Sequence, residues 1–139
     1  MKKLHVHLFV NDIDKSTEFY NQLFSTSPSL NKDDYVRWEL TDPALNFAIS
    51  NKGKAGIDHL GIQVENEHEL QNLLKPINQT AQDIDAPEKT SCCYAHSNKT
   101  WAEDPQGISW ELFHTYHNEE SFYGQQSDSA CCANSSCCS

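Results

Sequence analysis

The sequence predicts an α+β fold built from two modules, each with the element order βαβββ. Three observations lead to this prediction. Alternation of apolar and polar residues marks several short strands. One amphipathic helical segment follows the first strand in each half of the chain. Finally, His5 and His59 stand at matching places on those two first strands, 54 residues apart, as expected of an internal repeat.

The first half contains a strand, a helix and at least two further strands. Asp12 and Asp14 stand at the start of the helical segment, where acidic side chains favour a helix N-terminus. Residues 25–34 have the composition of a loop and leave room for one more short strand. The expected elements are strands at 4–10, 35–41 and 45–50 and a helix at 12–24.

The second half repeats this order and ends in a β-hairpin. Leu70, Leu73 and Leu74 line one face of its helix, which Pro76 helps to end. Asp104-Pro-Gln-Gly107 has the residue types of a type I turn, with Pro at the second position and Gly at the fourth. The expected elements are a helix at 67–77 and extended segments at 57–64, 90–95, 99–103 and 108–113.

The length of 139 residues suits one domain with a substantial core. We expect a single domain over 1–117, with module one at about 1–52 and module two at about 56–117. Residues 118–139 are polar and cysteine-bearing, and we expect them to form a flexible tail.

Net charge and hydropathy limit the classes of partner and the cellular location expected for the protein. A net charge of −10 argues against nucleic acids and anionic membranes as partners. The sequence has no 18-residue apolar run of the kind that spans a membrane. The N-terminus runs directly into a strand pattern rather than a signal-peptide core, which predicts a cytoplasmic protein.

The six cysteines form three adjacent pairs, unlike the dispersed cysteines of a disulfide-linked secreted fold. In a reducing cytosol we expect them to be thiols, and paired thiols suit soft metals and metalloids. The pairs are Cys92 with Cys93, Cys131 with Cys132, and Cys137 with Cys138.

Three side chains are candidate metal ligands: His5, His59 and Glu111. Glu111 lies on a half-buried strand, where an unpaired carboxylate is costly, so it is either at an exposed edge, in a salt bridge or on a metal. Two imidazoles and one carboxylate with open positions make the facial triad of non-haem Fe(II) oxygenases. His7 shares a strand face with His5 and could support the site or be a ligand itself.

Segments 5–20, 58–64 and 104–113 resemble the vicinal oxygen chelate superfamily, which includes glyoxalase I, extradiol dioxygenases and bleomycin resistance proteins. The resemblance covers roughly residues 3–115. It implies that the paired βαβββ modules form a cupped mixed sheet around one divalent metal, held by His5, His59 and Glu111. The place that matches Glu111 in the first half falls near Asn46, a poor ligand. This departure favours the three-ligand dioxygenase pattern over the four-ligand glyoxalase I pattern.

Within that superfamily, the chain resembles the C–As lyase and cadmium-induced protein group (ArsI/CadI-like). The features that carry this resemblance are the Cys92-Cys93 pair, the following Lys99-Thr-Trp101 segment and the cysteine-paired tail. This implies Fe(II)- and O2-dependent cleavage of trivalent organoarsenicals. Cys92 and Cys93 would hold the arsenic, because As(III) bonds stably to adjacent thiolates. The four tail cysteines, 131, 132, 137 and 138, would capture As(III) or Cd(II) and deliver it to Cys92 and Cys93, or the tail would be purely protective or accidental.

Several alternatives remain open at the level of sequence. Zn, Ni, Mn or Co also suit three nitrogen and oxygen ligands. The protein could be a non-catalytic Cd(II)- or As(III)-binding resistance protein. It could also be another dioxygenase or glyoxalase-like enzyme of the superfamily, with incidental cysteines. The expected partners are a small organoarsenical and O2, and exposed sheet edges are compatible with a homodimer.

Overall fold

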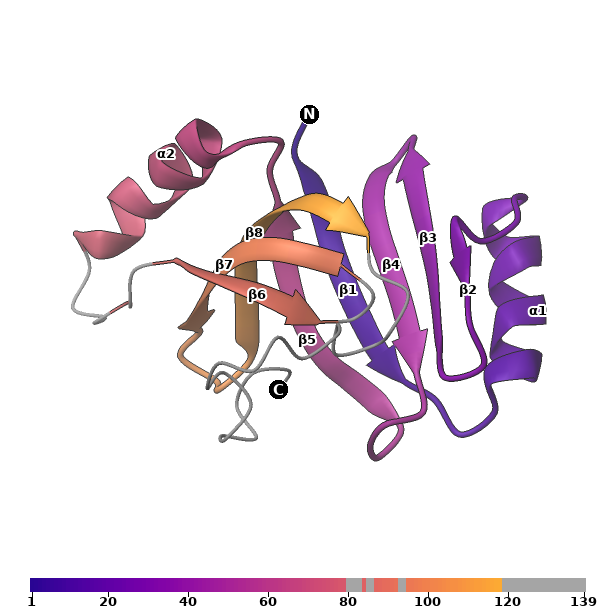
Figure 1. Cartoon of the computed structure of the whole chain (residues 1–139). Coiled ribbons are helices and arrows are strands. Elements are labelled where there is room, and N and C mark those ends of the chain that lie inside the picture. The colour runs from indigo at the N-terminus through magenta and orange to yellow at the C-terminus, as the bar shows by residue number, and fades with distance from the viewer. Residues whose placement is uncertain (80–83, 85–86, 93–94, 119–139) are drawn as a thin grey trace, which may run out of the picture. The chain divides into compact units, whose positions relative to one another are not determined.

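The computed structural model describes residues 1–79, 84, 87–92 and 95–118 (Figure 1). The chain divides into two compact units, Met1–Gln63 with Ala102–Glu111, and Val64–Trp101 with the chain from Leu112 onward. In the described part, none of the helices has the length and apolar character needed to cross a membrane.

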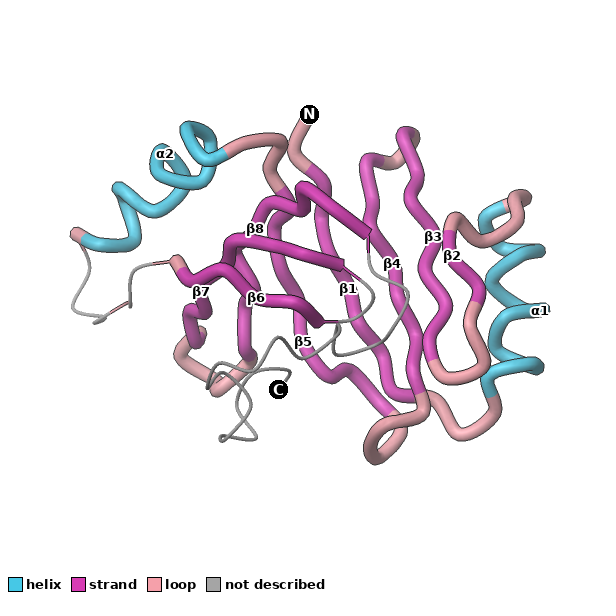
Figure 2. Tube along the Cα trace, in the orientation of Figure 1, coloured by secondary structure: helices cyan, strands magenta, loops and turns pink. Residues whose placement is uncertain are grey.

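The order of helices and strands confirms the α+β class and the two βαβββ modules (Figure 2). The first module comprises β1 (Lys3–Phe9), α1 (Ile13–Phe24), β2 (Leu30–Asn31), β3 (Tyr35–Thr41) and β4 (Ala44–Ser50). The second comprises β5 (Gly56–Gln63), α2 (Glu67–Asn78), β6 (Glu88–Cys92), β7 (Ala95–Glu103) and β8 (Ser109–Asn118).

Strand β1 is the centre of the first unit. It pairs in parallel with β4 and antiparallel with β5, and β3 and β2 follow beyond β4. The first residues of β8 lie on the far side of β5. This register sets His5 opposite Asn46 on β4 and opposite Gly61 on β5, while His7 lies opposite His59. Within the second unit, the strand order is β8-β7-β6.

Alternation along β1 separates the core from the site. Val6 and Leu8 pack on the apolar cluster that includes Trp38 and Phe47, together with side chains from α1. Because neighbouring residues of a strand point to opposite faces, His5 and His7 share the other face. The core is anchored by Trp38, which is fully buried and donates its indole N–H to Asn21 Oδ1 at 3.0 Å.

Helix α1 begins as the sequence predicts. Asp12 is its N-cap, and the side-chain carboxylate accepts a hydrogen bond from the main-chain N–H of Lys15 at 2.9 Å. This bond satisfies one of the amides that the first helical turn leaves without a helical partner. The helix ends at Phe24, and Ser25, its C-cap, adopts the left-handed conformation, with φ of 52°.

The closing hairpin is confirmed. Gly107 N donates to Asp104 O at 3.0 Å, the hydrogen bond that closes a four-residue turn. The Asp104 carboxylate also accepts from the main-chain N–H groups of Gln106 and Ile108, at 2.9 and 3.0 Å. Gly107 has φ of 85°, which glycine adopts at little cost. The turn thereby sets the start of β8, the strand that carries Glu111.

Two segments differ in extent from the expectation. A two-residue strand, β2, occupies part of the 25–34 loop. The extended segment expected at 90–95 is divided, since β6 ends at Cys92 and β7 already begins at Ala95. Strand β7 starts early because it pairs antiparallel with β6, which supplies the hydrogen bonds. This pairing runs from Glu88 opposite Lys99 to Cys92 opposite Ala95.

Candidate functional site

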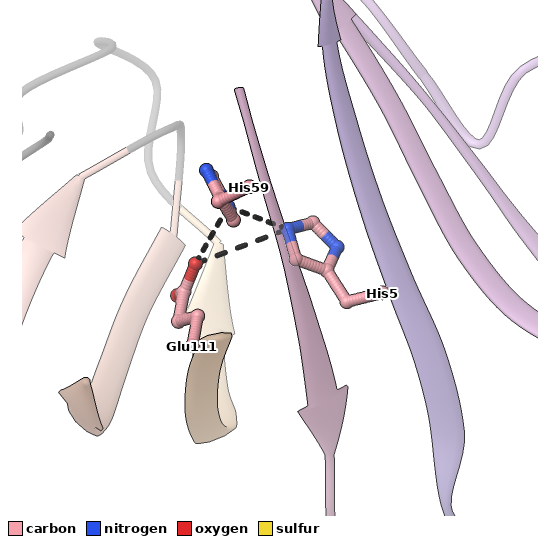
Figure 3. Close-up of side chains that lie close together, drawn as sticks. All are labelled: His5, His59 and Glu111. Atoms are coloured by element: carbon pink, nitrogen blue, oxygen red, sulfur yellow. Dashed lines mark hydrogen bonds and ion pairs between the residues drawn. The ribbon is translucent and has the colours of Figure 1, made fainter. Parts of the chain in front are cut away.

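Three buried side chains from three strands converge in the first unit (Figure 3). They are His5 on β1, His59 on β5 and Glu111 on β8. The Nε2 atoms of the two histidines are 3.0 Å apart. Glu111 Oε2 is 2.9 Å from His59 Nε2 and 3.8 Å from His5 Nε2. The structure thus brings together the three candidates that the sequence singled out.

The other nitrogen of each imidazole is engaged by an acceptor. His5 Nδ1 lies 3.1 Å from the main-chain oxygen of Asn46, and His59 Nδ1 lies 2.7 Å from Asp58 Oδ2. A carbonyl oxygen and a carboxylate can only accept, so each Nδ1 carries the proton and donates. In the neutral ring, Nε2 then bears the lone pair, directed toward the other histidine and Glu111.

A cluster of two imidazole lone pairs and one carboxylate requires positive charge, from a proton or from a metal ion. Burial alone would lower the pKa of His59, but hydrogen bonds with Asp58 and Glu111 outweigh it and raise the pKa to about 9. Burial lowers the pKa of His5 to about 4, against the attraction of Glu111. In the metal-free protein, His59 therefore holds the compensating proton at neutral pH.

The residues fit a divalent cation. The three donor atoms lie within 4.8 Å of one another and come from buried side chains. Two imidazole nitrogens and one carboxylate oxygen suit Fe, Mn, Co, Ni or Zn. Gly61 keeps this region open, because a Cβ there would collide with the main-chain oxygen of Glu111 and lie 3.2 Å from its Cβ. Glycine is thus the residue that lets β8 bring Glu111 beside the histidines.

Asn46 is not part of the converging donor set. Its amide Nδ2 donates to Gln63 Oε1 at 2.9 Å, while its main-chain oxygen accepts from His5. The first-half counterpart of Glu111 therefore orients a histidine through its backbone. Sequence reasoning missed this role, because a main-chain contact leaves no trace in residue type.

Sequence reasoning also missed Asp58 and Ser50 as functional residues, and it left open whether His7 supports the site or is a ligand. Asp58 accepts from His59 and lies 3.3 Å from His7 Nδ1, and His7 Nε2 lies 2.9 Å from Ser50 Oγ. Burial works to raise the pKa of Asp58, yet hydrogen bonds from His59 and His7 hold it well below its usual range. The adjacent Asp58-His59 pair was the one available signal, but neighbouring residues of a regular strand point to opposite faces.

The cysteine predictions concern a different part of the chain. Cys92 is the last residue of β6, in the second unit, where the structure describes its backbone. Cys93 and the four tail cysteines, 131, 132, 137 and 138, lie outside the described residues. The proposed roles of all six thiols remain predictions from sequence.

Comparison with curated proteins gives three informative relatives. The trivalent organoarsenical cleaving enzyme of Bacillus sp. (strain MD1) is 35% identical over 151 aligned positions, spanning 100% of this chain and 91% of the relative. The probable trivalent organoarsenical cleaving enzyme of Bacillus subtilis (strain 168) is 34% identical, spanning 95% and 91%. The cadmium-induced protein CadI of Mycobacterium bovis is 27% identical, spanning 88% and 82%. No family model matches the sequence.

Solved structures support the fold. A glyoxalase/bleomycin resistance protein/dioxygenase superfamily member from Vibrio splendidus 12B01 aligns with a TM-score of 0.54 at 16% identity, over 84% of this chain and 100% of that one. Homoprotocatechuate 2,3-dioxygenase from Arthrobacter globiformis aligns with a TM-score of 0.56 at 16% identity, over 88% and 38%. At these identities the likeness concerns the fold, and it agrees with the superfamily that the sequence motifs resemble.

Proposed function

The chain belongs to the family of trivalent organoarsenical cleaving enzymes, and from this we propose that it cleaves the carbon–arsenic bond of trivalent organoarsenicals with Fe(II) and O2. The observation that carries the proposal is the convergence of His5, His59 and Glu111, with each histidine's Nδ1 proton engaged elsewhere. Two nitrogen donors and one carboxylate are the ligand set of Fe(II) oxygenases.

His5 and His59 would hold iron through Nε2, and Glu111 through its carboxylate. Bound Fe(II) would supply the activation of O2 that organic substrates need. Burial of the three side chains limits access of bulk water, which strengthens electrostatic interactions inside the site. The hydrogen bonds to Asn46 and Asp58 hold the two imidazoles in place before any ligand arrives.

In this proposal, Cys92 and Cys93 bind arsenic as thiolates. As(III) is a soft centre that bonds to two neighbouring sulfur atoms, and the tether replaces a bimolecular encounter with a positioned one. For methylarsenite, one substrate molecule and one O2 give one arsenite and one formaldehyde, which conserves atoms and electrons without another reductant. A reducing cytoplasm would keep the thiols available, and assembly as a homodimer is compatible with this chemistry.

The experiment is a single-turnover reaction. The protein is loaded anaerobically with Fe(II), mixed with methylarsenite or phenylarsenite and exposed to O2, and the arsenic species are separated by chromatography. We expect arsenite from the wild type and from a variant with the four tail cysteines changed to Ser. We expect none from Glu111→Ala, and a large loss from Cys92→Ser or Cys93→Ser.

Absence of arsenite from a fully Fe(II)-loaded wild-type protein would contradict the proposal. If the same protein bound Cd(II) or As(III) tightly through its thiols, a sequestering role would be favoured instead. That second function is suggested by the similarity to the cadmium-induced protein and by the three cysteine pairs. Full arsenite release by both cysteine variants would contradict the proposed arsenic tether at Cys92 and Cys93.

A further inference from the structure

A chain of hydrogen-bonding groups leads away from the candidate metal site on the side of His59. Asp58 Oδ2 lies 2.7 Å from His59 Nδ1 and 3.3 Å from His7 Nδ1. His7 Nε2 lies 2.9 Å from the hydroxyl of Ser50. His7 and Ser50 are buried. We refer to Ser50, His7 and Asp58 as the His59 support.

The direction of each bond in the His59 support follows from the chemistry of its groups. An ionised carboxylate only accepts, so both histidines donate to Asp58 from Nδ1. Neutral His7 then has its lone pair on Nε2, so the Ser50 hydroxyl is the donor to it. The order is therefore from Ser50 to His7 to Asp58, with His59 donating to the same carboxylate oxygen from the other side.

This arrangement makes His7 a poor candidate for a ligand. Both of its ring nitrogens face partners within the support. His7, Asp58 and His59 also lie close enough together to hold a cation, but His7 does not belong to the group formed by His5, His59 and Glu111. Its ring stands edge-on to that of His59, with centroids 4.9 Å apart. Its other neighbours are the rings of Phe9 and Tyr35, at 5.4 and 5.8 Å.

The two histidines of the site are held in different ways. His5 donates to a main-chain carbonyl of β4, and the strand pairing between β1 and β4 already fixes that oxygen. His59 donates to a side-chain carboxylate that is part of no strand ladder. Rotation of the Asp58 side chain would release His59, unless a second group holds that carboxylate. His7 is positioned to do so, because β1 and β5 pair with His7 directly opposite His59.

We propose that the His59 support is a positioning device that fixes the His59 ring with Nδ1 donating to Asp58 and Nε2 directed toward His5 and Glu111, and so sets the metal affinity of the site. This inference rests on the proposed function in one respect, that the three converging residues bind a divalent metal. In this proposal Ser50, His7 and Asp58 act through His59, and none of them is among the three converging residues His5, His59 and Glu111.

The test measures Mn(II) affinity by electron paramagnetic resonance of the unbound ion. Mn(II) prefers oxygen and nitrogen donors, so the cysteines interfere little. Loss of a group that orients a metal-binding histidine costs about 10- to 100-fold in affinity, and we expect that loss for Asp58→Ala. For His7→Phe we expect a loss of about 10-fold, with unchanged stoichiometry.

Two variants separate positioning from general damage. His7→Asn places an amide N–H near the position of Nδ1, and we expect it to retain affinity within about 3-fold of the wild type. His114→Phe removes another histidine–carboxylate contact, that of His114 with Glu67 at 3.2 Å in the second unit, and should leave Mn(II) affinity unchanged. Circular dichroism and thermal melting verify folding. If His7→Phe does not fold, Ser50→Ala is the substitute, with an expected loss of about 3-fold.

The outcomes are distinct. Wild-type Mn(II) affinity in folded His7→Phe, or in Ser50→Ala where that is the substitute, would overturn the inference. The inference would also be overturned if His7→Phe and His7→Asn both lost Mn(II) binding as completely as His5→Ala. His7 would then be a ligand. Unchanged affinity in Glu111→Ala would instead refute the proposed metal site. Mn(II) binding that depends on His7, in a protein that releases no arsenite with Fe(II), would refute the proposed reaction and support the positioning role.

Discussion

The affinity of the site for metal is expected to rise with pH well beyond the range of an ordinary histidine. In the metal-free protein, the pKa of His59 is about 9, because hydrogen bonds with Asp58 and Glu111 outweigh the effect of burial. A metal ion must displace that proton, since binding needs the Nε2 lone pair. The pKa of His5 is lowered to about 4, so His5 contributes no second proton at neutral pH.

The size of the effect follows from one displaced proton. With a pKa of about 9, the apparent Kd for Mn(II) should fall about 20-fold between about pH 7 and about pH 8.5. An ordinary histidine with a pKa of about 6.5 would be neutral over most of that range, and the Kd would change only about 1.3-fold. The two cases are therefore easily distinguished.

The assay is Mn(II) binding at a series of pH values, followed by electron paramagnetic resonance, with proton release measured in a weakly buffered solution containing a pH indicator. The matched control is Asp58→Asn, which keeps an acceptor oxygen but removes the negative charge, so its pH dependence should be shallower. A variant with all six cysteines changed to Ser should behave as the wild type. An affinity that stays constant above about pH 7.5 would refute the reasoning, because His59 would then have an ordinary pKa.

Three further predictions concern stability and packing. Gly61→Ala should weaken Mn(II) binding by about 10- to 100-fold, because its Cβ would collide with the main-chain oxygen of Glu111 and force Glu111 away from the histidines. Retained affinity would argue against this close approach. Asp12→Ala should lower the free energy of unfolding by about 1 kcal/mol, since it removes the N-cap of α1. Urea denaturation measures this loss, and Asp12→Asn should retain most of the wild-type stability, because Asn also caps helices. Metal-free protein should lose about 2 kcal/mol of stability between about pH 6.5 and about pH 4.5. In the unfolded chain His5 is protonated with its ordinary pKa of about 6.5, whereas in the folded protein the pKa of His5 is about 4, so acid favours the unfolded state. The same acid loss in His5→Gln would contradict that assignment.

The repeat of local patterns was enough to predict the two βαβββ modules. Alternation in 35–41, the acidic start of the 12–24 helix and the Asp104–Gly107 turn are all local signals, and the structure confirms each of them. Local signals also gave the faces of the strands. His5 and His59 were expected to be equivalent by their place in the repeat, and both do point to the same site.

The sequence by itself determined the residue types and strand positions from which a metal site could be built, because period-two alternation and an internal repeat are properties of the chain alone. Only the tertiary structure decided how unequal the two histidines are. His5 is oriented by a main-chain oxygen of Asn46, 41 positions away, and His59 by a carboxylate shared with His7. That carboxylate belongs to Asp58, which is 51 positions from His7, so both contacts depend on strand register. Register is fixed by the pairing of whole strands and the burial of their apolar faces, so no short motif encodes it.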